Sequence, residues 1–253
     1  FKWYGSKMRR MLRFYTCICV QDEMSGELLK SIDVTNVEIC GDTRFDRVVE
    51  VREQAKKLSL VEVFANKAKS ENEKILIVGS SWPKDEDIII PYFNITADLK
   101  IIIAPHEIDE AHLKYIESIL ARPYIRYSKA IQENVGDYDC LIIDSFGLLS
   151  SIYNYGEIAY VGGGFGVGIH NVLEAAVYDM PVIFGPNFKK AREANQLIEQ
   201  GGGYSISSDE AFRSLMVEFL QYEDSLQAAG EHAGNYVRSN IGAVEKIIHI
   251  LNL

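Results

Sequence analysis

The segment from Tyr160 to Asn187 holds residues whose types and spacing suit the binding of an anion. The strand-like run Ile158–Val161 leads into the glycine-rich turn Gly162–Gly168, and a helical pattern begins at His170 and Asn171. Glycines let a ligand approach the backbone, and the first N–H groups of a helix attract negative charge. The sequence therefore predicts a phosphate cradle at this turn.

Glu174 adds a second kind of chemistry to the same segment. It lies early in the predicted helix, where a carboxylate can accept hydrogen bonds from sugar hydroxyls, as acidic residues do for ribose in dinucleotide-binding folds. Phosphate and ribose together indicate a nucleotide. The alternative is that the glycines only make a tight turn between strand and helix and that Glu174 is solvated.

Similar turns follow other strand-like runs. Small, aromatic, histidine or acidic residues end the runs at Gly79–Pro83, Ala104–Glu107, Asp144–Gly147 and Gly185–Asn187. Because open α/β sheets bind ligands at the carboxyl ends of their parallel strands, these turns are expected to line one shared crevice.

The elements that position these turns alternate between strand and helix along the chain. This alternation predicts the α/β class with a doubly wound, Rossmann-like parallel sheet. The segment from Ser208 to Leu251 is predicted to be helical throughout. The predicted strands are Cys17–Val20, Val37–Cys40, Lys74–Gly79, Lys100–Ala104, Cys140–Ile143, Ile158–Val161, Pro181–Phe184 and Gly203–Ile206, and the predicted helices include Asp22–Lys30, Arg47–Lys57, Asp109–Leu120, Phe146–Tyr155, Asn171–Tyr178 and Lys190–Gln200.

Composition limits the class of protein. The chain has 253 residues, of which 47% are hydrophobic and 25% charged, and a formal net charge of −10. Such a charge argues against a broad nucleic-acid-binding surface, so no nucleic acid is expected as a partner. The cysteines lie in strand-like runs without metal-ligand spacing and are expected to be reduced core thiols. No apolar run reaches the roughly 18 residues of a membrane-spanning helix.

A change in composition near Gly41–Asp46 suggests a domain boundary. Residues 1–45 are interpreted as the tail and linker of a preceding domain, and residues 46–253 as a complete second domain. The first residue is Phe1, which suggests a piece of a longer protein. Residues 1–16 are basic and aromatic, which fits either a helix on a partner or membrane surface or a helix packed on a neighbouring domain.

Taken together, the turns resemble the 3-deoxy-D-manno-octulosonic acid (Kdo) transferases, which move Kdo from CMP-Kdo onto lipid A precursors and have the two-domain GT-B fold. The chain is similar to their carboxyl-terminal half. The matching segments are Gly41–Asp46 (GDTRFD), Gly79–Pro83 (GSSWP), Ala104–Glu107 (APHE), Asp144–Leu148 (DSFGL), Tyr155–Gly164 (YGEIAYVGGG), His170–Glu174 (HNVLE) and Phe184–Phe188 (FGPNF).

The resemblance implies a binding site for CMP-Kdo. It assigns the phosphate to the Gly163–Gly164 turn with His170 and Asn171, and the ribose to Glu174. The loop Ser145, Phe146, Gly147 and Leu148 would read cytosine through backbone groups, and Ser80, Trp82, Pro105 and His106 would line the donor side of the cleft. It implies no metal and no other cofactor.

One departure from the family concerns charge. The family has an arginine between the proline and histidine of its Pro-x-His-x-Glu segment, whereas here Pro105 runs directly into His106. A bidentate partner for the phosphate is therefore missing. The candidates to replace it are Arg126, Lys189, Lys190 and Arg192.

The expected activity is that of an inverting glycosyltransferase, of which this chain is the donor-binding part. The resemblance places the catalytic base, the lipid A precursor acceptor and the membrane surface with the family's amino-terminal domain, at the cytoplasmic face of the bacterial inner membrane. The fragment alone is expected to be soluble and inactive. Two alternatives stay open: another GT-B enzyme that uses a UDP-sugar, as transferase or 2-epimerase, and a non-catalytic nucleotide-binding module.

Overall fold

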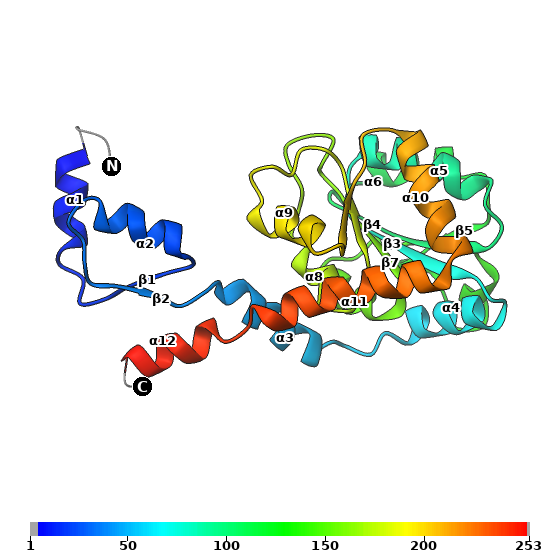
Figure 1. Ribbon diagram of the computed structural model, residues 1–253. Helices are drawn as coiled ribbons and strands as arrows, with labels where there is room; N and C mark the ends of the chain where they lie inside the picture. Colours follow the sequence, from blue (N-terminus) through cyan, green and yellow to red (C-terminus); the bar gives the residue numbers. More distant parts are fainter. Residues whose placement is uncertain (1–4, 252–253) are drawn as a thin grey trace. The chain divides into compact units, whose positions relative to one another are not determined.

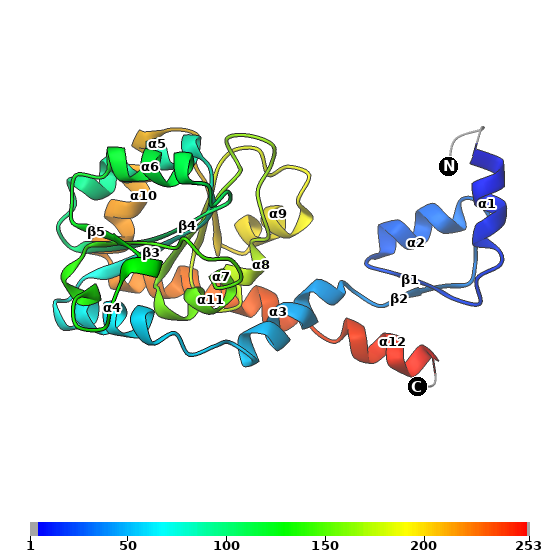
Figure 2. The same cartoon turned by 180° about the vertical axis from the view of Figure 1, so that it is seen from behind.

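The computed structural model describes residues 5–251 (Figures 1 and 2). The chain divides into two compact units, one formed by Phe1–Glu50 with Arg238–Leu253 and the other by Val51–Val237. This division differs from the predicted domains, because the last segment groups with the amino-terminal residues. Of the basic, aromatic segment 1–16, residues 1–4 lie outside the described residues.

The smaller unit contains a two-stranded parallel sheet of β1 (Ile18–Val20) and β2 (Val37–Ile39), connected by α2 (Glu23–Lys30). It also holds α1 (Ser6–Leu12), the first residues of α3 (Thr43–Glu53) and the carboxyl-terminal α12 (Ala243–Leu251). The short predicted strands in this region are confirmed.

Asp46 explains why the carboxyl-terminal helix belongs to the smaller unit. Its carboxylate accepts hydrogen bonds from the N–H groups of Gly242, Ala243 and Val244, at 2.7, 3.0 and 3.2 Å. These N–H groups at the start of α12 have no partner within the helix, so a carboxylate from a distant segment satisfies them. Because its partners lie far apart in the sequence, this contact could not be predicted from local sequence patterns.

The larger unit is built on a seven-stranded sheet in which every paired strand is parallel, with the order β5-β6-β4-β3-β7-β8-β9. The predicted doubly wound α/β class is confirmed. The strands are β3 (Lys74–Ser81), β4 (Leu99–Pro105), β5 (Tyr124–Arg126), β6 (Cys140–Ile142), β7 (Ile158–Val161), β8 (Val182–Phe184) and β9 (Gly203–Ser205).

Helices cover both faces of this sheet. In both views α5, α6 and α10 lie on one side, and α4 and α11 lie on the other (Figures 1 and 2). The central strands β3 and β4 are mostly apolar, since nearly all of their residues are buried on both faces of the sheet. The helices are α4 (Ser59–Ser70), α5 (Pro83–Asn94), α6 (Glu110–Ile119), α7 (Leu149–Ile152), α8 (Leu173–Ala176), α9 (Arg192–Glu199), α10 (Asp209–Gln221) and α11 (Glu223–Ser239).

Three elements were not predicted. The helices α4 and α5 lie between strands where no pattern was assigned, and α5 carries Pro91 in its interior, which is an unusual position for proline in a helix. The strand β5 has three residues, of which only Ile125 is buried, so it shows no recognisable alternation.

Four predicted helices have wrong limits. The prediction Arg47–Lys57 is α3, which begins at Thr43 and ends at Glu53. The prediction Phe146–Tyr155 is the four-residue α7 followed by a 3₁₀ turn, and Asn171–Tyr178 is the four-residue α8. The carboxyl-terminal segment is mostly helical. It forms three separate helices, α10, α11 and α12, because the helical conformation is interrupted at Tyr222 and at Asn240–Gly242.

The order of the strands reverses between β3 and β7. From β3 the chain first adds β4, β5 and β6 on one side, and it then returns to add β7, β8 and β9 on the other side of β3. Connections on the two sides of this pair diverge, and in open α/β sheets ligands bind at this switch point, beyond the carboxyl ends of the strands. The ends of β3 and β7 are Gly79–Ser81 and Val161–Gly163.

Candidate functional site

The turns that follow β3, β4 and β7 are held together by backbone hydrogen bonds. The N–H of His106 donates to the carbonyl of Ser81 at 2.9 Å, and the N–H of Gly162 donates to the carbonyl of Gly79 at 2.9 Å. Ser80 has a φ of 52°, a left-handed conformation that bends the chain as β3 ends. Three predicted segments are thus brought to one place.

Three rings from these turns form a stack. The rings of Trp82 and His106 have centroids 4.6 Å apart, and those of His106 and His170 have centroids 4.5 Å apart. The indole Nε1–H of Trp82 donates to Nε2 of His170 at 3.4 Å. The stack joins residues from all three turns, which the sequence had assigned separately to the donor side and to the phosphate.

The contact with Trp82 indicates which ring nitrogen of His170 carries the proton. Because Nε2 accepts a hydrogen bond, the remaining proton of the neutral ring lies on Nδ1. Burial, and then the neighbouring His106, lower the pKa of His170, so the neutral form is favoured. His170 is thereby suited to donate a hydrogen bond from Nδ1 to an anion.

A cavity of about 150 Å³ opens beside the stack. Its lining includes six predicted residues, and these come from three segments far apart in the sequence. They are Ser80, Pro105, His106, Ser145, Phe146 and Gly147. The cavity is also lined by Leu149, whereas the predicted Leu148 is the residue before α7 and is not among the lining residues.

The loop that carries Ser145 is shaped by its neighbours. Gly147 has a φ of 76°, which favours glycine, and Phe146 is 80% exposed. The Asp144 carboxylate accepts hydrogen bonds from both the N–H and the hydroxyl of Ser128. The loop therefore contributes three residues to the cavity wall, one of them an exposed aromatic side chain.

The glycine turn is built for close contact between backbones. A Cβ on Gly162 would lie 2.2 Å from the carbonyl oxygen of Ser80, and one on Gly164 would lie 2.5 Å from the nitrogen of Gly185. Gly163 has a φ of 92°. Packing between neighbouring turns alone thus requires glycine here, as the tight-turn alternative proposed.

The structure differs in two ways from the phosphate cradle that was predicted at the glycine turn. The N–H of Gly163 already donates to the Asp85 carboxylate at 2.9 Å. The following helix α8 begins at Leu173 and has only four residues, so it does not supply the dipole of a long helix. Anion binding at this turn therefore depends on side chains such as His170 more than on the helix.

Asn171 and Glu174 contact each other. The Asn171 side-chain amide donates to the Glu174 carboxylate at 3.1 Å, and its carbonyl oxygen accepts from the N–H of Leu173 at 3.2 Å. Neither residue is among those that line the cavity beside His106. Their predicted contacts with ribose and phosphate stay predictions.

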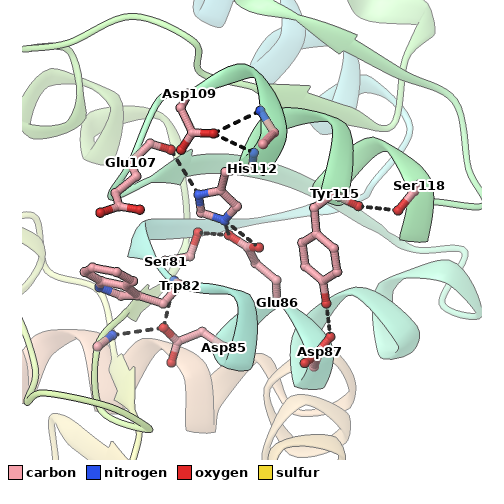
Figure 3. Close-up of polar contacts among 12 residues, drawn as sticks. Ser81, Trp82, Asp85, Glu86, Asp87, Glu107, Asp109, His112, Tyr115 and Ser118 are labelled. Carbon is pink, nitrogen blue, oxygen red and sulfur yellow. Dashed lines mark hydrogen bonds and ion pairs between the residues drawn. The ribbon is translucent and has the colours of Figure 1, made fainter.

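Asp85 is a site residue that the sequence analysis missed. It is 1% exposed, and its carboxylate accepts hydrogen bonds from the N–H groups of Trp82 and Gly163, both at 2.9 Å (Figure 3). The carboxylate also accepts from the Tyr160 hydroxyl at 2.7 Å. Burial, and then Asp85, raise the pKa of Tyr160, which keeps the phenol protonated. Asp85 thus joins the turn after β3 to the turn after β7.

The next residue, Glu86, joins the turn after β3 to α6. Its carboxylate accepts from the Ser81 hydroxyl at 2.7 Å and lies 2.9 Å from Nε2 of His112 (Figure 3). Nδ1 of His112 contacts the carbonyl of Glu107 at 3.0 Å. Since a carbonyl can only accept, Nδ1 carries a proton, and one further proton is shared between Nε2 and Glu86.

Within residues 5–251, no group of three or more His, Cys, Asp or Glu side chains is arranged to hold a metal ion. The cysteines are free thiols, and burial raises the pKa of Cys140. Within the same residues no helix has the length and apolar character needed to cross a membrane.

Comparison with known proteins found distant relatives among the 3-deoxy-D-manno-octulosonic acid transferases. A 3-deoxy-D-manno-octulosonic acid transferase from Rickettsia typhi is 24% identical over 255 residues, which is 95% of this chain and 52% of the relative. One from Chlamydia trachomatis is 28% identical over 189 residues, or 72% of this chain and 43% of the relative. The chain is a distant homologue of the Kdo transferases. No protein-family model matches it.

A solved structure supports the fold of this Kdo transferase homologue. The C-terminal CMP-Kdo binding domain of WaaA from Acinetobacter baumannii matches with a TM-score of 0.59 and 18% identity, covering 77% of this chain and 97% of that domain. The predicted resemblance to the carboxyl-terminal domain of GT-B glycosyltransferases is thus confirmed. The chain spans about half the length of the curated relatives that it matches.

The structure also shows which basic side chains of this Kdo transferase homologue could replace the arginine that is missing between Pro105 and His106. Arg126 forms ion pairs with Glu110 and Glu117, at 2.7 and 2.6 Å, and is therefore already neutralised. Lys189 and Lys190 are exposed, and Arg192 lies at the start of α9. Lys84, which the sequence analysis did not consider, is exposed on the turn that carries Trp82.

Proposed function

We propose that this chain binds the donor CMP-Kdo and that the protein to which it belongs transfers Kdo to a lipid A precursor. One observation carries the proposal: motifs of the resemblance that are far apart in sequence converge on one cavity. Segments containing Ser80, His106 and Ser145 line it together. The structural similarity to the CMP-Kdo binding domain from Acinetobacter baumannii supports this assignment.

Within the donor site, the cavity beside His106 receives the nucleoside. The backbone of the loop Ser145–Leu148 contacts cytosine, and Pro105 and Ser80 form the opposite wall. The phosphate lies near the ring stack, where the Nδ1–H of His170 donates to it. The turn at Gly164 and the side chains of Asn171 and Glu174 complete the contacts with phosphate and ribose.

The proposed reaction is an inverting displacement. A base removes the proton of an acceptor hydroxyl, the acceptor oxygen bonds to the anomeric carbon of Kdo, and the bond from that carbon to the phosphate oxygen breaks. CMP leaves with the electron pair. The residues of this chain hold the phosphate and offset its growing negative charge by hydrogen bonds, without a metal.

The base and the acceptor are proposed to lie outside the residues described above. Neither His106 nor Glu107 is assigned as the base. The acceptor and the membrane surface are assigned to the amino-terminal domain of the family, at the cytoplasmic face of the bacterial inner membrane. The 253-residue chain alone is therefore expected to bind CMP without transferring Kdo.

Calorimetric titration with CMP and with UDP tests the nucleotide. We expect CMP to bind more tightly than UDP, and His106→Ala to weaken CMP binding by about tenfold through loss of the ring stack and a cavity wall. The matched control is His249→Ala, because His249 lies on α12 of the smaller unit and is not among the residues that line the cavity. Tighter binding of UDP would favour the alternative, a GT-B enzyme that uses a UDP-sugar.

A further inference from the structure

A second pocket adjoins the ring stack on the side of Trp82. Its volume is about 300 Å³, and its surface is almost entirely apolar. It lies between the start of α5 and the glycine turn. It is lined by Trp82, Pro83, Lys84, Asp85, Phe165, Gly166 and Val167. The sequence resemblance assigns no ligand to Pro83, Lys84, Phe165, Gly166 or Val167. We call this the Trp82–Val167 pocket.

The two pockets meet at a shared wall. Trp82 lines the Trp82–Val167 pocket, His106 lines the nucleoside cavity, and their rings stack at 4.6 Å with an interplanar angle of 25°. A ligand with a nucleoside at one end and a second ring at the other fits across this wall. Its linking phosphate would then lie beside the stack, within reach of His170.

The Trp82–Val167 pocket has one positively charged residue, Lys84, beside its apolar surface. Within residues 5–251 Lys84 has no ion-pair partner. The acidic lining residue, Asp85, is 1% exposed and its oxygens already accept three hydrogen bonds. The ammonium of Lys84 is therefore free to pair with an anion in the pocket.

Building on the proposed function, we infer that the Trp82–Val167 pocket binds the sugar-acid ring of the donor and that Lys84 pairs with its carboxylate. The sugar of CMP-Kdo is an acid, so it has an anionic group besides the phosphate. The Trp82 indole stacks on His106 and also lines the pocket, where it can contact the C–H groups of the sugar ring. Lys84 then selects donors whose sugar carries a carboxylate over those with neutral sugars.

The test compares two ligands that differ only in the sugar. The affinities of CMP and CMP-Kdo are measured calorimetrically for the 253-residue chain and for Lys84→Ala, Lys84→Arg and Lys114→Ala. Lys114 is a matched control because it is exposed on α6 and lines neither pocket. We expect Lys84→Ala to weaken CMP-Kdo binding about tenfold and CMP binding less than about twofold, since only the carboxylate contact is lost. Lys84→Arg and Lys114→Ala should retain the affinity for CMP-Kdo.

Fluorescence reports the place of the sugar independently. The chain has two tryptophans, so Trp3→Phe leaves Trp82 as the sole indole. In that background CMP-Kdo should change the Trp82 emission more than CMP does.

Three results would overturn the inference. Equal weakening of CMP and CMP-Kdo by Lys84→Ala would make Lys84 a phosphate ligand instead. Unchanged binding of both would remove Lys84 from the site, and an equal Trp82 response to both ligands would place the sugar elsewhere. If the unmodified chain bound neither ligand, the proposed function would fail together with the inference, which separates that outcome from the other three.

Discussion

The backbone N–H of Gly163 donates a hydrogen bond of 2.9 Å to the carboxylate of Asp85. This contact joins the turn after β7 to the start of α5. It lies at the pair β3 and β7, where the order in which the chain adds strands to the sheet reverses. It also uses a donor that the glycine turn was expected to offer to a phosphate. The position of the turn is therefore maintained by a buried carboxylate of the protein itself.

Asp85→Asn is expected to destabilise the fold and weaken CMP binding. Asparagine keeps one acceptor oxygen, but its amide nitrogen would face a donor, either the Tyr160 hydroxyl or the N–H groups of Gly163 and Trp82. Leaving a buried group unsatisfied costs about 1–3 kcal/mol of unfolding free energy. Urea denaturation measures this cost.

The control for this change is Asp98→Asn, since Asp98 is exposed. Its unfolding free energy should stay within about 0.5 kcal/mol of that of the unmodified chain. An Asp85→Asn variant as stable as Asp98→Asn would show that the contacts of Asp85 do not hold the turns.

Alanine at Gly162 is expected to destabilise the chain by at least about 2 kcal/mol. The new Cβ would lie 2.2 Å from the Ser80 carbonyl oxygen, and backbone on both strands must move to relieve the clash. Gly166→Ala is the matched control, because its Cβ would meet nothing closer than 3.7 Å. Thermal unfolding followed by circular dichroism compares them, and equal midpoints would contradict the packing role of Gly162.

The fold class was predictable because its signals are local. Runs such as Ile75–Val78 and Ile101–Ile103 are apolar and mostly β-branched, and each is followed by small or polar residues. The same logic located the site, since turns after parallel strands meet at one edge. His106, Ser145 and His170 were found in this way.

Asp85 and Glu86 were missed for a physical reason. Two acids in the first turn of a helix are usually solvated, and they stabilise the helix through its dipole. Their burial follows from where α5 begins, next to the turn after β7 and packed against α6, and this depends on tertiary packing. The interior Pro91 concealed α5 itself, so the acids had no predicted element to belong to.

The shared proton of Glu86 and His112 predicts a dependence of stability on pH. Burial raises the pKa of Glu86, and the folded pair retains one proton. In the unfolded chain a glutamate and a histidine release that proton above the ordinary histidine pKa of about 6.5. The folded state then binds more protons than the unfolded state, so this contribution to stability falls as pH rises above that value.

Glu86→Gln tests this dependence, because glutamine cannot take up the proton. Urea denaturation between about pH 6 and pH 9 should show a smaller decline of unfolding free energy for Glu86→Gln than for the unmodified chain. Glu199→Gln, at an exposed position, should keep the full decline. Identical slopes for the Glu86→Gln variant and the unmodified chain would mean that the pair holds no extra proton.

His170 is expected to be neutral at pH 7, with its proton on Nδ1. The Trp82 indole donates to Nε2, and burial followed by the proximity of His106 lowers the pKa of His170. Nitrogen-15 NMR of the imidazole should show the Nδ1–H tautomer and a titration below the ordinary histidine pKa of about 6.5. In Trp82→Phe the donor to Nε2 is lost, and the preference for this tautomer should weaken. An Nε2–H ring in the unmodified chain would abolish the hydrogen bond from Trp82, since the indole nitrogen can only donate. It would also remove His170 as the donor to the phosphate, because its Nδ1 would then only accept.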